Sequence, residues 1–179
     1  MTGALDTLKN KLLEAKVWDK SLSLKRGDFL KHADTTDSNI YHIEEGCVRL
    51  FFIEDKYDHV INFGFQGSLV SALDSYILEK SSSVAIQAIN KTRASVISKA
   101  NLKHFVEQDK QLTELWPLVF EEITLARIER EKDLLTRSSE LRYKRVIGRA
   151  PQLFQEIPHK YIASYLRMTP ETLSRLQNS

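Results

Sequence analysis

Cysteine is nearly absent from this sequence, which has only Cys47 among its 179 residues. A single thiol excludes a disulfide framework and a cysteine-based zinc site within one chain. No apolar run approaches the roughly 18 residues of a membrane-spanning helix, and the amphipathic N-terminus has neither the apolar core nor the cleavage site of a secretory signal. These absences predict a soluble chain of a reducing compartment, most simply the cytoplasm, with no membrane partner.

A large excess of one charge is also missing, because 26 basic and 24 acidic residues leave a formal net charge of +2. This balance excludes a strongly basic tail and an acidic solvating segment. The charge is nevertheless uneven, since residues 138–179 carry a net +4 and the rest of the chain a net −2. A basic module on a slightly acidic body favours a polyanionic partner. The alternative is that these cations only solvate the outer faces of helices.

Apolar residues make up 42% of the chain, enough for one large domain or two small ones with a real core. Residues 4–16 have leucines at helical spacing and are expected to form a short helix. From residue 22 to residue 98, short β-branched and aromatic runs alternate with turn clusters, which is typical of an antiparallel sandwich or barrel. The expected strands are 21–24, 29–31, 40–43, 48–53, 59–65, 84–88 and 93–98, with a short helical insertion at 69–78.

A helical period returns after residue 99 and is longest over residues 109–137. Here an apolar stripe repeats at spacings of three and four residues, as in the seam of a helix pair. Its members include Trp116, Val119, Ile123 and Ala126. We therefore predict a homodimer joined along this stripe, although the pattern also fits a helix packed only on its own barrel. Pro117 is expected to mark a helix start or a kink.

Two very short helices are expected near the C-terminus, at 158–166 and 169–177. Thr169, Pro170 and Glu171 have the order of an N-cap, a first-turn proline and a first-turn acid. Ala163 is small enough for the two helices to cross closely, and the outer face of the second helix is polar. These features predict a helix-turn-helix, whose second helix fits the major groove of DNA. An ordinary helical hairpin is the alternative.

Residues 157–166 (IPHKYIASYL) and 168–175 (MTPETLSR) resemble the helix-turn-helix of the Crp/Fnr family of transcription regulators, in versions found in Bacteroidetes-type bacteria. The upstream order also looks like that family. It has a β-roll resembling a cyclic-nucleotide-binding domain, then a long dimerisation helix, then the DNA-binding module. Residues 24–30 and 41–50, with Gly27 and Gly46 at turns, look like the opening strands of the roll. The resemblance covers nearly the whole chain.

The resemblance implies roles for individual residues. Pro170, Glu171 and Arg175 match the family's base-reading positions, where Arg175 would reach a guanine and Glu171 a cytosine amine. Pro170 replaces an arginine often found there and is limited to apolar contacts. The residues that match positions near the phosphate backbone are His159, Lys160, Thr169 and Thr172. The alternative for each of these residues is an ordinary solvated surface position.

The positions that bind cyclic AMP in the family are changed in this sequence. The family uses a Gly-Glu pair for the ribose and an Arg-Ser pair for the cyclic phosphate. The matching positions hold Ser71, Ala72, Ser82 and Ser83. A buried anion needs a fixed cation and hydrogen-bond donors, so we predict that cyclic AMP does not bind with regulatory affinity. No cofactor is expected, and an unidentified small effector remains open.

The residues that other kinds of sensor and enzyme need are missing from the sequence. Iron–sulfur sensing needs several cysteines, so Cys47 is interpreted as a strand cysteine beside a turn, and no histidine is singled out as a haem ligand. A metal-binding cupin, the enzyme alternative, needs a His-x-His motif, whereas His42 is followed by Ile43 and Glu44. No catalytic motif stands out, so we predict neither a metal site nor an enzyme.

The sequence as a whole predicts an α+β protein. It has an N-terminal antiparallel β-roll over 1–108, a dimerisation helix over 109–137, and a helix-turn-helix domain over 138–179 without an evident wing. We expect a homodimeric, sequence-specific DNA-binding regulator, with RNA polymerase as an open candidate partner. Because no wing follows the second helix, phosphate contacts are expected to be few, unless the domain is truncated. The alternative is a regulator that acts through protein contacts or an unknown ligand and binds DNA weakly.

Overall fold

The computed structural model describes residues 3–178. Its N-terminal part begins with helix α1 (Ala4–Ala15) and continues as a β-roll. The strands are β1 (Lys20–Leu24), β2 (Phe29–Lys31), β3 (Asn39–Glu45), β4 (Val48–Glu54), β5 (Tyr57–Gly64), β6 (Leu69–Val70), β7 (Ala85–Ala88) and β8 (Thr92–Ser98). A short helix, α2 (Leu73–Leu78), stands between β6 and β7.

The strands pair into antiparallel sheets with the orders β1-β8-β3-β6 and β2-β7-β4-β5. Alternate side chains from both sheets point inward, as the period of a strand requires, and they form the core of the roll. This core includes Tyr41, Ile43, Val48, Leu50, Val70, Ile86, Ala94 and Val96. The turn from β3 to β4 needs Gly46, because its φ is +81° and an added Cβ would lie 2.3 Å from the carbonyl oxygen of Lys91.

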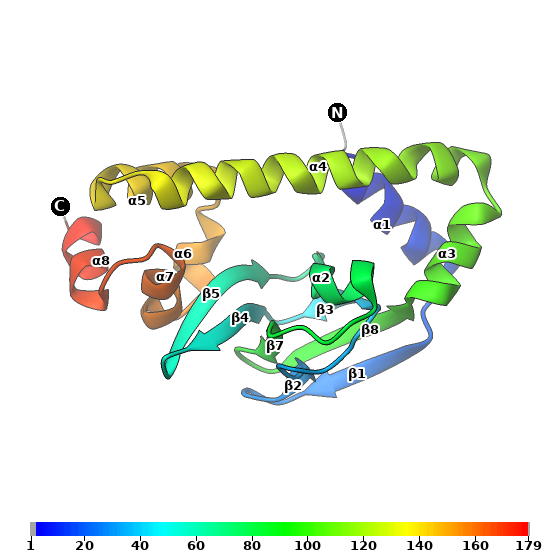
Figure 1. The fold of residues 1–179 in the computed structure, drawn as a ribbon, viewed down its shortest axis with the longest axis horizontal. Coiled ribbons are helices and arrows are strands. Elements are labelled where there is room, and N and C mark those ends of the chain that lie inside the picture. The colour runs from blue at the N-terminus through cyan, green and yellow to red at the C-terminus, as the bar shows by residue number, and fades with distance from the viewer. Residues whose placement is uncertain (1–2, 179) are drawn as a thin grey trace.

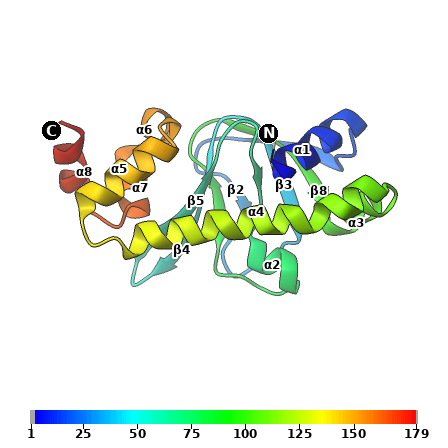
Figure 2. The same ribbon diagram turned by 90° about the horizontal axis from the view of Figure 1, so that it is seen from above.

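A helical layer covers one side of the roll (Figures 1 and 2). It consists of α1, α3 (Lys99–Glu107) and the long helix α4 (Lys110–Leu135). Their apolar faces share a buried cluster that includes Leu8, Leu12, Leu102, Val106, Leu112 and Val119. The backbone N–H of Leu5 at the start of α1 donates to the Glu122 carboxylate of α4 at 3.0 Å. Helix α1 is therefore held against α4 by both apolar and polar contacts.

Pro117 does not begin a helix, contrary to one of the two alternatives from the sequence. Helix α4 begins at Lys110, where the side chain of Asp109 caps it by accepting from the N–H of Gln111 at 2.8 Å. It continues through Pro117 to Leu135. The proline removes the N–H that would bond the carbonyl of Thr113. Both residues are exposed, so water can satisfy that carbonyl.

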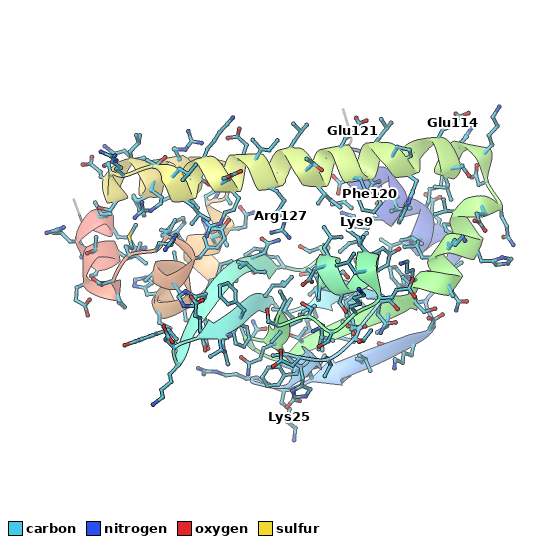
Figure 3. The ribbon with its side chains drawn as sticks, in the orientation of Figure 1. Lys9, Lys25, Glu114, Phe120, Glu121 and Arg127 are labelled. Atoms are coloured by element: carbon cyan, nitrogen blue, oxygen red, sulfur yellow. The ribbon has the colours of Figure 1, made fainter. Side chains whose placement is uncertain are left out.

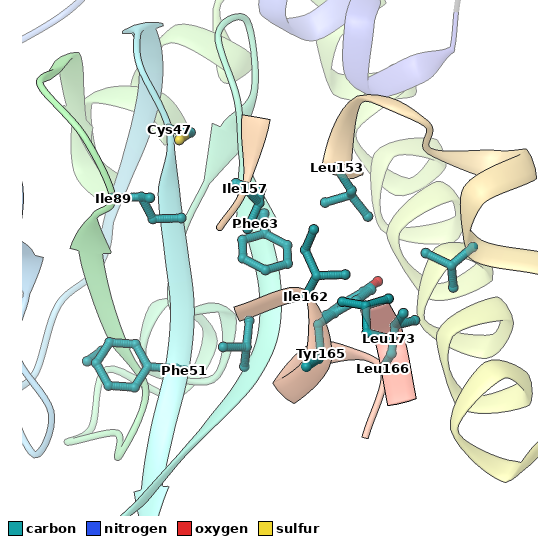
Figure 4. Close-up of a cluster of buried hydrophobic side chains, with 14 residues drawn as sticks. Cys47, Phe51, Phe63, Ile89, Leu153, Ile157, Ile162, Tyr165, Leu166 and Leu173 are labelled. Carbon is teal, nitrogen blue, oxygen red and sulfur yellow. The ribbon is translucent and has the colours of Figure 1, made fainter. Parts of the chain in front are cut away.

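The C-terminal helices turn back beside the end of α4 (Figure 1). They are α5 (Ser139–Arg149), α6 (Gln152–Glu156), α7 (His159–Tyr165) and α8 (Pro170–Gln177). Helix α7 packs on β5, while α8 lies at the end of the molecule. Leu153, Ile157 and Leu166 of this helical unit share one buried cluster with Phe51 and Phe63 of the roll (Figure 4).

The order of elements confirms the predicted α+β architecture, and two details differ. The insertion expected at 69–78 is a two-residue strand followed by a short helix, because β6 pairs with β3 before the chain turns. Helix α6 was not predicted, since its five residues are too few to show a helical period. Within residues 3–178, no helix is long and apolar enough to span a membrane.

Candidate nucleic-acid interface

The turn between α7 and α8 is closed by two backbone hydrogen bonds. The N–H of Arg167 donates to the carbonyl of Ser164 at 3.1 Å, and the N–H of Met168 donates to that of Ala163 at 3.0 Å. This pair is the Schellman arrangement, which requires a left-handed residue after the helix. Arg167 takes that conformation with a φ of 50°, although glycine would do so without strain. The direction of α8 relative to α7 is therefore fixed by the backbone.

A buried arginine of α5 holds the same turn. Arg142 is only 8% exposed. Its Nε donates to the carbonyl of Leu166 at 2.6 Å, and its Nη2 to that of Arg167 at 3.2 Å. Its Nη1 donates to the carbonyl of Thr136, in the link between α4 and α5. One guanidinium thus ties the helix-turn-helix to the end of the long helix.

The two short helices cross closely, as the small residue at position 163 led us to expect. Ala163 is 1% exposed, and Ile162, Leu166 and Leu173 are fully buried around it. A larger side chain at 163 would push the helices apart, because this interior is close-packed. The inner face of α8 is therefore buried against the rest of the protein through Leu173.

The N-terminus of α8 is capped as the sequence indicated. The Thr169 hydroxyl accepts from the N–H of Thr172 at 3.2 Å, and Pro170 occupies the first turn. Hydrogen bonds from its own backbone N–H and from the Thr169 hydroxyl hold the pKa of the Glu171 carboxyl below its ordinary value. Glu171 itself is exposed on the outer face of α8.

The structure brings together four of the seven residues predicted to contact DNA. His159 of α7 and Pro170, Glu171 and Arg175 of α8 line one shallow, open depression. Ser174 and Asn178, which the sequence did not single out, line it too. Lys160 and Thr169 are exposed outside this depression, and Thr172 is half-buried with its hydroxyl 3.2 Å from that of Thr169. The outer face of α8 is thus polar and exposed.

The first helix of the motif is docked on the roll. The Ser164 hydroxyl donates to the carbonyl of Asp58 at 2.7 Å and accepts from the N–H of Val60 at 3.1 Å. The rings of Tyr165 and Phe63 lie with their centroids 5.4 Å apart (Figure 4). Helix α7 therefore contacts the roll directly, while the outer face of α8 stays exposed.

A buried carboxylate joins α4 to α5. Asp133 is fully buried, and its oxygens accept from Arg145 Nε at 2.9 Å and from Arg149 Nη2. Burial alone would raise the pKa of Asp133, but the two arginines outweigh it and hold the pKa below its ordinary value. Two of the basic residues counted toward the C-terminal charge are therefore engaged within the protein.

The face of α4 that the sequence assigned to a second chain is used within this one. Val119 is 3% exposed inside the cluster shared with α1, and Trp116 and Ile123 pack against that cluster. Ala126 is exposed and borders a cavity on the same side. A dimer seam through this face stays a prediction, and the burial of Val119 within its own chain argues against it.

A different stripe of α4 is free. Its apolar members are Leu118 at 48% exposed, Leu125 at 63%, Ile128 at 42% and Leu135 at 73%. Glu121 falls on the same stripe and projects from the side of α4 away from the roll (Figure 3). The spacings of seven and three residues are those of a coiled-coil seam.

Of the four residues expected at a degenerate effector site, Ser71 borders a cavity of about 370 Å³ between the roll, α1 and α4, and donates to the carbonyl of Asn39 at 2.9 Å. The other three do not line this cavity: Ala72 and Ser82 are buried, and Ser83 is exposed. None of the four supplies a cation or a carboxylate.

A cation does lie beside Ser82, but it is already occupied. Lys31 is 3% exposed, and its ammonium donates to the carbonyls of His32, Ser82 and Val84 at 3.0, 3.1 and 2.7 Å. Burial lowers its pKa, and nearby aspartates, led by Asp37, act in the opposite direction. Its three protons are used by the fold.

Cysteine and metal chemistry add nothing to this site. Cys47 is buried, and burial raises the pKa of its thiol to about 11, which leaves it inert near neutral pH. In the part of the chain that the structure describes, no three His, Cys, Asp or Glu residues are grouped as metal ligands would be.

Sequence reasoning missed the residues that position the motif, chiefly Arg142, Arg130 and Ser164. Arg142 stands four residues before buried Val146, and a cation on the apolar side of a helix is a weak sign of a buried role. Ser164 and Arg130 have no comparable signal, because their partners are backbone groups far away in the sequence.

No protein-family model and no curated protein matches the chain. Solved structures do match. FixK2 from Bradyrhizobium japonicum is 20% identical, with a TM-score of 0.69 over 89% of this chain and 82% of that one. A CooA mutant from Carboxydothermus hydrogenoformans is 16% identical, with a TM-score of 0.74 over 99% and 83%. CLP from Xanthomonas campestris, described as a c-di-GMP-responsive global regulator, is 12% identical, with a TM-score of 0.65 over 94% and 89%.

Proposed function

We propose that this chain, which has the fold of the Crp/Fnr transcription regulators, is a regulator of that type and reads DNA with α8. The observation that carries the proposal is the geometry of α8. Its inner face is fixed by Leu173 and by the capped turn, and its outer face is polar and exposed. A short helix held in this way at one end of the molecule suits the major groove, which is about 12 Å wide.

Arg175 is the base-reading residue that the contacts support best. It is exposed, and its guanidinium has no ion-pair or hydrogen-bond partner among residues 3–178. It can therefore present two donors to one guanine. Glu171 is exposed and could accept from a cytosine amine, and Pro170 offers only apolar contact. Lys160 and the N-terminus of α8 are placed for phosphates.

Dimerisation through α4 follows from the same proposal, with the seam on the outer stripe formed by Leu118, Leu125, Ile128 and Leu135. Four exposed aliphatic side chains in line on one helix are costly in water and gain by pairing with a copy of themselves. Two subunits would present two copies of α8 to adjacent grooves, about 34 Å apart.

The effector is proposed not to be cyclic AMP. The positions that match the family's ribose and phosphate contacts hold three serines and an alanine, and Lys31 beside Ser82 donates its protons to carbonyls. An anion without a free cation would lose more hydration than it gains. A calorimetric titration with cyclic AMP is expected to give no saturable heat, and micromolar binding would contradict this.

One observation favours a second function, in which the protein acts through protein contacts and binds DNA weakly. Helix α7 is docked on β5 through Ser164, so in this conformation the reading unit cannot turn independently of the roll. A regulator held this way would need a signal to reposition its two copies of α8.

Selection from a pool of random DNA duplexes separates the two functions. The full-length protein should enrich a site with two related half-sites, because a two-fold dimer reads two copies of one sequence. Enrichment of no sequence, with only salt-sensitive binding to every duplex, would favour the protein-contact function. An Ala163→Leu variant, which forces α7 and α8 apart, serves as the inactive control.

A further inference from the structure

We infer that the cavity between the roll, α1 and α4 binds an amphiphilic anion, a molecule with an apolar body and a terminal carboxylate or phosphate. The inference rests on the proposed function, because it names the chemical class of the effector. The cavity measures about 370 Å³, which lies within the usual range of small-molecule sites, about 300–1,000 Å³.

One end of the cavity is apolar. Aliphatic and aromatic side chains from α1, the roll and α4 line it, among them Leu8, Leu50, Ile61, Leu69, Trp116 and Ile123. Water in such a space finds few hydrogen-bond partners. An apolar body that displaces this water gains roughly 25 cal/mol for each Å² of surface removed from solvent.

The other end is cationic. Arg127 and Arg130 of α4 and Arg149 of α5 line it, together with Tyr165 of α7. Arg149 is paired with Asp133, but Arg127 has no ion-pair or hydrogen-bond partner in the described chain and projects from α4 toward the roll (Figure 3). The one lining acid, Glu122, already accepts the N–H of Leu5. The three lining arginines outnumber the one lining acid, so the lining carries a net positive charge.

Arg130 leaves a buried donor unused at this end. Its Nη2 donates to the carbonyl of Tyr165, and its guanidinium carbon lies 3.5 Å from the centroid of the Tyr165 ring. Its Nη1 is buried without an acceptor among residues 3–178. Burial lowers the pKa of Arg130, Tyr165 and Asp133 act in the opposite direction, and the charges of Arg149 and Arg127 lower it. A buried unpaired donor is expensive, and a ligand oxygen would satisfy it while offsetting the like charges.

The position of this end gives the ligand a route to the DNA-reading unit. Arg130, Arg149 and Tyr165 belong to α4, α5 and α7, so one bound anion would contact all three helices. A ligand shifts an equilibrium only by its different contacts in the two states. Here those contacts include the helix that docks on β5, so occupancy should change how firmly α7 is held.

Calorimetry on the full-length protein without DNA tests the inference, with ten-carbon probes below their micelle concentrations. Decanoate and decyl phosphate are expected to bind saturably and to show which anionic group is preferred. Decanol should bind at least tenfold more weakly, and decyltrimethylammonium should not bind. Shortening decanoate to octanoate and hexanoate should weaken binding about fourfold for each methylene removed.

Arg127→Gln is the matched variant, because Arg127 makes no contact that the fold needs. It should weaken decanoate binding about tenfold, whereas Arg26→Gln, which removes the same charge from the exposed turn between β1 and β2, should not change it. Equal binding of decanol and decanoate, equal effects of the two substitutions, or no saturable heat would each overturn the inference. If DNA selection fails while decanoate binds as described, the proposed function is wrong and the site stands.

Discussion

Asp133 shows how one carboxylate can position a whole unit. It is fully buried between Arg145 and Arg149, and it lies in α4 while both arginines lie in α5. Asp133→Asn should lower the free energy of unfolding by about 3 kcal/mol, because it leaves two cations without their shared partner. Urea denaturation measures this. The control is Glu131→Gln, an exposed acid on the same helix, which should change stability by less than about 0.5 kcal/mol.

The same carboxylate sets a pH dependence of known sign. Because its pKa is lowered in the folded protein, the contribution of Asp133 is complete above the ordinary aspartate pKa of about 3.9 and is lost as the pH falls through the lowered value. The stability difference between the wild type and Asp133→Asn should therefore be constant near neutral pH and should shrink below about pH 4. A difference that persisted unchanged at pH 2 would contradict the ion pairing.

Arg175→Ala tests the reading role of α8. On the duplex enriched by selection, the substitution should weaken binding by about 1–3 kcal/mol and relax the preference at one base position in each half-site. On an unrelated duplex the loss should be much smaller. Anisotropy titrations at fixed salt measure both. Asn178→Ala, at the edge of the same depression, is the matched control, and an equal loss on both duplexes would assign Arg175 to phosphate rather than to a base.

At the scale of elements, local signals in the sequence predicted most of the fold. Thr169, Pro170 and Glu171 mark the start of α8 because capping acts within one turn. The strands of the roll follow from alternation and turn residues for the same reason. The cavity and the hydrogen bonds of Arg142 to the α7–α8 turn could not be predicted, because both depend on groups that come together only when distant segments pack.

Helix α4 shows why a dimer face is hard to assign from the sequence. It carries two apolar stripes, one through Val119 with spacings of three and four residues, and one through Leu125 with spacings of three and seven. Periodicity indicates that a face is buried but not by what. In the structure α1 and the roll cover most of the first stripe and the second is exposed, which favours the second as the seam.

Leu125→Glu is the corresponding prediction. A carboxylate in the middle of the outer stripe would be buried against its own copy, so the protein should sediment as a monomer at concentrations where the wild type is a dimer. Ile77→Glu, which changes an aliphatic residue of α2 that is 50% exposed, should leave the sedimentation unchanged. Leu125 is 63% exposed and Ile77 is 50% exposed, so both variants should keep a melting temperature close to that of the wild type. A dimer that survives Leu125→Glu would place the interface elsewhere.

At the scale of the whole molecule, the predicted division at residues 108 and 137 remains a prediction, and the packing crosses it. Phe63 of β5, Leu153 of α6 and Leu173 of α8 belong to one buried cluster (Figure 4). Polar contacts add to this packing. Arg142 of α5 donates to carbonyls of the α7–α8 turn and of the α4–α5 link, and Asp133 of α4 pairs with Arg145 of α5. The roll and the C-terminal helices therefore share one packed core in this conformation, which is the physical route by which the proposed signal would reach α7.

The net charge of +4 over residues 138–179 overstates what the whole molecule can offer to DNA. Within this segment Arg142, Arg145 and Arg149 are engaged inside the protein, and Lys144 is paired with Glu140 at the surface. Lys160, Arg167 and Arg175 have no ion pair among the described residues. A dimer would therefore neutralise at most six phosphates from this segment. Each contributes about 0.9 to the slope of log K against log salt concentration, which predicts a slope no steeper than about −5.

Anisotropy titrations between about 50 and 200 mM salt measure this slope on the selected duplex. Lys160→Gln should reduce its magnitude by roughly 2 in the dimer, since one contact is lost from each subunit, and should weaken binding to all duplexes alike. Lys144→Gln should leave the slope unchanged, because Lys144 is paired with Glu140. A slope near −13, the value for all seven cations in both subunits, would mean that the ion pairs of α5 open on DNA and that the packing described above is not the bound conformation.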